Sequence, residues 1–249
     1  LFNQVEAKNI GPTIMSGRVV DLAVNPKNPT EFYVAYATGG LWYTNNNGTS
    51  FTPVMDSAET VNCGSVTVDW NSGTIWVGTG EVNASRSSYA GVGVLKSSDK
   101  GKTWENLGLK DSHHISRIWV NPSNLNEIVV AAVGHLYTTN KERGIYKSVD
   151  GGATWKRTLF VDENTGASSL SIDYTNPRIL YAATWQHRRY PWKVESGGPG
   201  CGLWKSTDAG ISWSPMTALP LPNNNDRVKM AVSSSDPNIV WVAVSYGSN

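Results

Sequence analysis

A string of eight residues recurs along this chain at a nearly constant spacing. It reads SSDKGKTW at 97–104, SVDGGATW at 148–155 and STDAGISW at 206–213, and a weaker copy, TNNNGTSF, stands at 44–51. Successive copies begin roughly 50 residues apart, a period typical of a four-stranded propeller blade and longer than most helical repeats. The spacing therefore predicts an all-β propeller built from four-stranded antiparallel blades.

The residues around each copy predict four short strands per unit. Before each copy stands a short strand of β-branched and aromatic residues opened by glycine, as in GLWYT at 40–44 and GIYKS at 144–148. Further upstream, two more apolar runs flank turn sequences such as NPKNPT and SSSDPN. Proline presets one torsion in such turns, and Asn or Asp binds nearby amides. The eight-residue string then joins the third strand of each unit to the fourth.

The units divide the chain into successive blades. We expect a single β-propeller region over residues 1–249, with complete blades at about 16–55, 63–107, 115–160 and 168–217. A partial fifth blade occupies 227–249, and residues 1–12 are a possible closing strand. Propellers close with about 4 to 8 blades, because an open blade leaves an unpaired edge. We therefore expect a fragment of a larger ring, which needs remaining blades or a partner chain to close it.

The polar residues of the string suit a turn. Its Ser or Thr hydroxyl and its Asp carboxylate can bind turn amides, and its glycine accepts a torsion that other residues resist. The Trp begins the fourth strand and packs between strands. We interpret these residues as structural rather than catalytic: Asp99, Trp104, Asp150, Trp155, Asp208 and Trp213.

The string Ser-x-Asp-x-Gly-x-Thr-Trp resembles the Asp-box, or bacterial neuraminidase repeat (BNR). Three further segments, IGPTIMSGRVV near the start, VGTGE at 77–81 and GLKDSHHISRIWVNP at 108–122, resemble the first blades of bacterial sortilin-like (VPS10-type) propellers. Sialidases and xyloglucanases are more distantly similar. The resemblance covers almost the whole chain and implies a propeller fold, which serves both enzymes and binding proteins.

Composition excludes several classes of partner and cofactor. With 21 basic and 20 acidic residues, the formal net charge of +1 does not favour nucleic acid. No apolar run approaches the roughly 18 to 20 residues that cross a bilayer. Cys63 and Cys201 do not make a disulfide scaffold, and whether they are bonded stays open. The sequence indicates no metal site and no organic cofactor.

Strand direction sorts the connections onto two faces. The Asn-Pro turns and the Asp-boxes share one face, and the longer, irregular loops share the other, together with all four histidines. Irregular loops on a rigid scaffold are where binding groups collect. The candidate ligand-binding residues are Arg18, Glu81, Asn83, Arg86, His114, Arg117, His135, His187, Arg188, Arg189, Trp192 and Arg227. Three of them, Arg18, Arg117 and Arg227, open inner strands that line the axial channel.

Two functions fit these features. The first is a non-catalytic binding or scaffold propeller, outside the cytoplasm, that recognises a peptide, protein or glycan through the irregular loops. The alternative is a glycoside hydrolase, sialidase-like or xyloglucanase-like, with its site at the channel mouth. The Arg-Ile-Pro signature of sialidases is absent, because Arg18 is followed by two valines. A xyloglucanase-like reaction needs two opposed carboxylates, and no such pair can be placed from the sequence. The catalytic residues stay unknown.

Overall fold

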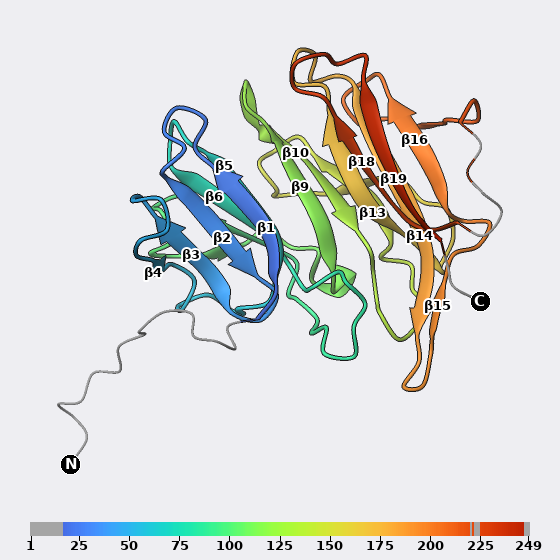
Figure 1. The fold of residues 1–249 in the computed structure, drawn as a ribbon, viewed down its shortest axis with the longest axis horizontal. Coiled ribbons are helices and arrows are strands. Elements are labelled where there is room, and N and C mark those ends of the chain that lie inside the picture. The colour runs from blue at the N-terminus through green and yellow to red at the C-terminus, as the bar shows by residue number, and fades with distance from the viewer. Residues whose placement is uncertain (1–16, 220, 222–224, 247–249) are drawn as a thin grey trace.

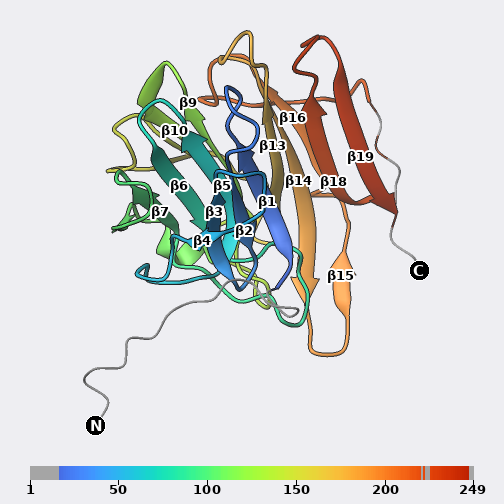
Figure 2. The same cartoon turned by 60° about the vertical axis from the view of Figure 1, so that its left-hand side comes forward.

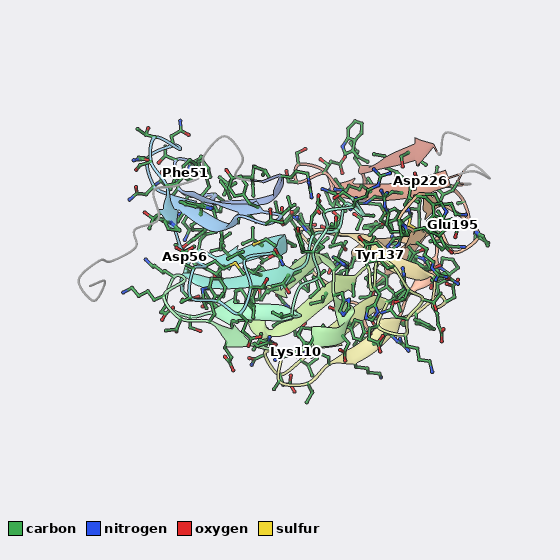
Figure 3. The ribbon with its side chains drawn as sticks, turned by 90° about the horizontal axis from the view of Figure 1, so that it is seen from below. Phe51, Asp56, Lys110, Tyr137, Glu195 and Asp226 are labelled. Carbon is green, nitrogen blue, oxygen red and sulfur yellow. The ribbon has the colours of Figure 1, made fainter. Side chains whose placement is uncertain are left out.

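The computed structural model describes residues 17–219, 221 and 225–246, and these form an all-β molecule (Figure 1). The possible closing strand at residues 1–12 lies outside the described residues. The sheets follow one another around an arc, with the first blade at one end and a two-stranded sheet at the other (Figure 3). Four four-stranded antiparallel blades and part of a fifth confirm the fold class expected from the repeat.

The strands of each blade pair in chain order, except that β15 is an additional strand beside β14. The first two blades contain β1 (Val19–Val24), β2 (Phe32–Tyr36), β3 (Gly40–Thr44) and β4 (Thr52–Pro53), then β5 (Cys63–Asp69), β6 (Thr74–Thr79), β7 (Val94–Ser97) and β8 (Glu105–Asn106). The third contains β9 (Ile115–Asn121), β10 (Asn124–Ala132), β11 (Gly144–Ser148) and β12 (Lys156–Leu159). The fourth contains β13 (Thr165–Ile172), β14 (Leu180–Arg189), β15 (Val194–Ser196), β16 (Gly202–Ser206) and β17 (Ser214–Pro215), and the fifth contains β18 (Asn225–Val232) and β19 (Val240–Tyr246).

One segment expected to be an irregular loop is instead regular. Strand β14 continues to Arg189 and pairs with β15, with His187 opposite Ser196 and Arg189 opposite Val194. The resulting hairpin projects beyond the other blades (Figure 2). In this extension Trp185 and His187 are buried while Gln186 and Arg188 are partly exposed, and this alternation of inward and outward side chains suits a strand. A single 3₁₀ turn, η1 (Lys110–Ser112), interrupts the described β structure, and no described helix is long and apolar enough to cross a membrane.

Hydroxyl side chains on the first strands of the second, third and fourth blades connect each of them to the blade that follows. The Thr67 hydroxyl donates to the Ile118 carbonyl at 2.7 Å, and the Ser116 hydroxyl donates to the Ala167 carbonyl at 2.7 Å. Ser168 makes a similar bond, at 3.0 Å, to a carbonyl of β18. These bonds satisfy carbonyls between neighbouring sheets, where water is excluded. They hold successive inner strands in register along the channel.

The apolar core is divided among the spaces between neighbouring blades. The cluster between the first two blades includes Leu41, Met55 and Ile75, all fully buried. The second, third and fourth blades pack both of their faces against neighbouring blades, so their inner and middle strands are apolar on both sides. Cys63 belongs to this first cluster, and it and Cys201 are free thiols rather than a disulfide. Burial raises the pKa of the Cys63 thiol to about 12, which makes it unreactive.

The Asp-boxes repeat one set of hydrogen bonds. In the second box, the Gly152 amide donates to Ser148 Oγ at 2.8 Å, and Thr154 donates its amide and its hydroxyl to the two carboxylate oxygens of Asp150 at 2.9 and 2.5 Å. The boxes that begin at Ser97 and Ser206 show the same pattern. The polar residues of each string are therefore used inside their own turn.

The Trp of each box reaches back to the preceding blade. The indole Nε1 of Trp104 donates to the Val54 carbonyl at 3.0 Å, and that of Trp155 donates to the Leu107 carbonyl at 2.7 Å. Trp213 makes the equivalent bond to Thr158 Oγ1 at 3.1 Å. Each indole therefore ties the outer strand of one blade to the next blade.

Protonation of the Asp-box carboxylates should lower the stability of the fold in acid. Hydrogen bonds from Thr103 lower the pKa of Asp99 to about 2, and hydrogen bonds from Thr154 lower that of Asp150 to about 2. At Asp208, burial opposes the shift, but hydrogen bonds from Ser212 outweigh it and the pKa is again about 2. An unfolded Asp has a pKa of about 3.9, so the stabilisation is complete above that pH and is lost as the pH falls toward 2.

We therefore expect the thermal unfolding midpoint to fall steeply between about pH 4 and pH 2. Calorimetry across this range measures it. The Asp150→Asn variant should show a shallower fall, because it has one fewer carboxylate to protonate. Identical pH profiles for the variant and the wild type would contradict this account.

Candidate functional site

The long connections gather at the end of the molecule opposite the Asp-boxes (Figure 1). We call this end the loop face, and it comprises residues 80–93, 107–114 and 133–143, the β14–β15 hairpin and residues 197–201. All four histidines lie on it, as the strand directions predicted. Seen from this end, Tyr137, Glu195 and Asp226 lie on the same side of the arc (Figure 3).

Two of the predicted binding residues are bound to each other. Arg18 donates Nε to Glu81 Oε1 at 2.9 Å and Nη2 to Glu81 Oε2 at 2.6 Å, across the space between the first two blades. Ser88 also donates to the Glu81 carboxylate. Burial alone would raise the pKa of Glu81, but Arg18 and Ser88 lower it below its usual value. Glu81 is therefore an ionised anchor for the β6–β7 loop and not a carboxyl group kept protonated for acid catalysis.

Arg143 organises the β10–β11 loop from inside. Its side chain is fully buried and donates to the carbonyls of His135 at 2.7 Å and Asn164 at 3.1 Å, and to Asn140 Oδ1 at 2.9 Å. Arg143 Nη1 also lies 3.2 Å from Nδ1 of the buried His187. A guanidinium can only donate, so His187 Nδ1 is the acceptor and its proton is on Nε2.

The histidines remain neutral at physiological pH where they are buried. Burial and the Arg143 charge lower the pKa of His187 to about 3, and its ring stacks on Trp185 with centroids 4.1 Å apart. Burial, with a smaller effect of His113, lowers the pKa of His114 to about 4. The other two rings, His113 and His135, stack at 3.7 Å, and burial also lowers the pKa of His113. The four histidines thus pack the loops together rather than forming a ring of exposed ligands.

A pocket of about 550 Å³ opens beside this packed layer. Asn83, Arg86, Trp185, Arg189 and Arg227 line it, so the fold brings together four of the predicted binding residues from three separate segments. The β6–β7 loop, the β14–β15 hairpin and the start of β18 supply its walls.

Arg227 is the central cation of this pocket. Its Nη1 donates to Asn83 Oδ1 at 3.2 Å, and its guanidinium carbon lies 5.1 Å from the centre of the Trp185 ring. Its Nε and Nη2 are buried and have no hydrogen-bond partner among the described residues, and the same holds for Nε of Arg189. Burial lowers the pKa of Arg227, but a guanidinium stays protonated at neutral pH. The pocket therefore offers N–H groups in need of acceptor oxygens.

The polar residues of this pocket that the sequence did not indicate include Asp226 and Ser196. Asp226 Oδ1 accepts a hydrogen bond from Trp185 Nε1 at 2.9 Å and another from Ser196, and Ser196 Oγ also accepts from Trp185 at 2.8 Å. Asp226 directly precedes Arg227 in β18, and this position next to a candidate arginine could have drawn attention to it. Nothing local marks Ser196, whose role depends on the β14–β15 hairpin.

The remaining predicted residues lie outside the pocket. Arg117 lies in the axial channel and binds both oxygens of Asp21, at 2.9 and 3.0 Å. Arg188 donates to the Tyr137 carbonyl at 3.3 Å, and Trp192 is 72% exposed on the hairpin. The structure therefore does not assemble the three strand-opening arginines into one free cluster, since acidic side chains occupy two of them.

The described carboxyl groups do not show the signature of a general acid. Where the environment shifts the pKa of a described Asp or Glu, the shift is downward, as at Glu81 and Glu195. A glycosidase acid needs a raised pKa and a second carboxyl group close by.

Within residues 17–219, 221 and 225–246, no group of three or more His, Cys, Asp or Glu side chains could hold a metal ion.

Comparisons with known proteins support the fold and identify relatives. The Sortilin-Vps10 family profile, described as sortilin, neurotensin receptor 3, matches residues 93–245, more than half of the chain. The xyloglucanase Xgh74A of Acetivibrio thermocellus is 28% identical over 151 residues, which is 54% of this chain and 16% of that protein. The chain thus spans less than a fifth of that relative.

Two solved structures share the fold. An ancestral GH74 enzyme superposes with a TM-score of 0.63 at 20% identity, covering 91% of this chain and 28% of that one. The GH74 xyloglucanase from Xanthomonas campestris gives a TM-score of 0.63 at 18% identity, covering 91% of this chain and 35% of that one. At these identities the likeness shows the propeller fold alone.

Proposed function

The chain belongs to the Sortilin-Vps10 family, and from this premise we propose that it is a non-catalytic binding propeller. Its ligand is a peptide, protein or glycan segment held by the loop face, with the pocket around Arg227 as the centre of contact. The observation that carries the proposal is the set of buried guanidinium N–H groups of Arg189 and Arg227 that lack acceptors in this pocket. An extracytoplasmic location belongs to the proposal, which the family match and the xyloglucanase relatives favour.

The chemistry of the pocket favours recognition over reaction. Buried N–H groups without partners cost about 1 to 3 kcal/mol each, and a ligand that supplies oxygens relieves this cost. Peptide carbonyls, carboxylates and sugar hydroxyls all provide such oxygens. Trp185 is itself buried, with 4% of its surface exposed, and its ring supports the Arg227 guanidinium instead of offering free surface to the ligand.

Substitution of Arg227 should weaken ligand binding without lowering the stability of the fold. We expect Arg227→Gln to weaken ligand binding roughly tenfold or more, since hydrogen bonds to a charged group contribute about 1.5 to 3 kcal/mol. The thermal midpoint should stay unchanged or rise, because the variant removes a half-buried charge with unpartnered N–H groups. Peptide and glycan arrays identify a ligand, and titration calorimetry then compares the variant with the wild type.

Arg178→Gln provides the matched control, because Arg178 is exposed in a turn of the Asp-box face, far from the loop face. It should bind like the wild type. Equal affinities for the Arg227 variant and the control would remove this pocket from the proposal.

A glycoside hydrolase is the second candidate, favoured by the xyloglucanase relatives. Incubation with xyloglucan oligosaccharides and product chromatography test it directly. Turnover of these sugars by the wild-type chain would establish the hydrolase, whereas retention of the sugar without turnover supports the binding propeller. Glu81→Gln does not decide between the two, because the Glu81 carboxylate anchors the β6–β7 loop and its loss would disturb either site.

A further inference from the structure

A second pocket, of about 760 Å³, lies between the first two blades on the Asp-box face. Its walls come from β2 to β4 of the first blade, and from the end of β5 and the Asp-box turn of the second. Tyr43 and Trp70 are partly exposed in it, and Tyr33 packs against both rings, at centroid distances of 4.9 and 5.5 Å. The pocket therefore has an aromatic wall of three rings.

Charged and polar groups surround these rings. Glu31 accepts the Tyr43 hydroxyl at 2.6 Å and an Asn25 amide at 2.7 Å, and these bonds lower the pKa of the Glu31 carboxyl. The carboxylate keeps further lone pairs for another donor. Lys100 and Lys102, both exposed, lie on the Asp-box side and offer ammonium donors. An acceptor and two donors thus stand around an aromatic surface.

The pocket exists because the first blade departs from the repeat. The residue before the first position of each box is Lys96, Lys147 or Lys205 in the other blades, but Tyr43 in the first. In the third blade, the Lys147 ammonium donates to the Ala209 carbonyl of the next Asp-box at 2.7 Å and lies 3.9 Å from Glu127. That lysine spans the space between neighbouring blades, and its absence leaves the space beside Tyr43 open.

Tyr43 and Lys147 occupy equivalent positions, and each lies beside an equivalent glutamate. Thr44 faces Phe32 across the first blade, as Ser148 faces Ile128 across the third, so Glu31 and Glu127 occupy the same place in the blade. Tyr43 retains the glutamate as its partner but replaces the bridging ammonium with a ring. A second aromatic residue, Trp70, stands where the turns of the first and third blades have Pro26 and Pro122.

We propose that this pocket between the first two blades binds a saccharide ring, with Tyr43 and Trp70 against its apolar face and Glu31, Lys100 and Lys102 on its hydroxyls. A sugar ring has a flat C–H surface and hydroxyls that both donate and accept, which matches an aromatic wall bordered by both kinds of group. A proline-rich peptide would also stack on aromatic rings, but proline has no N–H to donate to Glu31. The site is separate from the loop face and independent of the function proposed for it.

The test compares Tyr43→Lys with the wild-type chain. The variant restores the residue of the other three blades and can pair with Glu31, so its thermal midpoint should stay within about 3 °C of the wild type. A glycan array of neutral and uronic-acid oligosaccharides, followed by titration calorimetry, identifies the sugar. We expect Tyr43→Lys to weaken its binding roughly tenfold or more, since it removes a stacking ring and fills the pocket.

The Arg227→Gln variant separates the two sites. Sugar binding that Tyr43→Lys weakens and Arg227→Gln leaves intact supports the second pocket. Sugar binding that depends on Arg227 alone overturns it and supports only the loop-face proposal. Absence of sugar binding, or binding of a decaproline peptide in its place that Tyr43→Lys abolishes, also overturns it.

Discussion

Replacing Arg143 with methionine should lower the free energy of unfolding by about 3 kcal/mol or more, although both side chains are long and unbranched. The guanidinium is fully buried, and it holds the carbonyls of His135, Asn164 and Thr138. Methionine cannot donate, so these carbonyls lose their partner inside the protein, at about 1 to 3 kcal/mol for each that stays unsatisfied. Urea unfolding, followed by tryptophan fluorescence, measures the change.

Arg178→Met is the matched control for this substitution. Arg178 is exposed in a turn, and surface changes of this kind usually fall within about 0.5 kcal/mol. Arg143→Lys should recover only part of the loss, because one ammonium cannot reach acceptors spread around a planar fork. If Arg143→Met and Arg178→Met unfolded at the same urea concentration, Arg143 would not be the organiser of its loop.

Gly80→Ala should destabilise the chain by about 4 kcal/mol, or prevent its folding. Gly80 has a φ of +86°, and a Cβ there would lie 1.9 Å from the His113 carbonyl oxygen and 2.8 Å from the Gly91 amide nitrogen. Both obstacles are backbone atoms, so no side chain can move aside to relieve them. The Gly91 amide donates to that same carbonyl at 2.6 Å, and the two loops would have to separate.

Gly48→Ala is the control that measures the cost of the left-handed backbone torsion without a backbone clash. Gly48 has a similar φ of +79°, but a Cβ there meets only the side-chain rings of Phe51 and Phe32, at 3.5 and 3.7 Å, which is ordinary van der Waals contact. It should cost about 1 to 2 kcal/mol, the usual penalty for a left-handed residue with a side chain. Thermal unfolding of both variants by circular dichroism gives the comparison, and equal costs would show that the loop contact at Gly80 contributes nothing.

The repeated turn could be predicted because its bonds are local. In each Asp-box the hydroxyl and the carboxylate bind groups two to four residues away, so eight consecutive letters contain the whole turn. The period of the copies then predicted the number of strands per blade, and strand direction predicted that all four histidines share one face. The structure agrees on each of these points.

The pairing of the candidate residues could not be predicted, because it depends on contacts between distant positions. Arg18 and Glu81 are 63 residues apart, and Arg227 and Asn83 are 144 apart. All three strand-opening arginines looked alike in sequence, yet Asp21 and Glu81 bind two of them and leave the third with unpartnered N–H groups. The extension of β14 into a hairpin with β15, which brings Arg189 to Arg227, was likewise not expected.

By itself the sequence determined the blade, its turns and the face to which each loop belongs, because propensity, turn chemistry and repeat spacing act within one blade. Only the tertiary structure decided which polar groups are satisfied and which remain available. That outcome depends on how neighbouring blades meet, where one residue such as Tyr43 in place of lysine leaves a pocket open. Packing between blades brings together residues that are far apart in the chain, so local sequence patterns do not predict it.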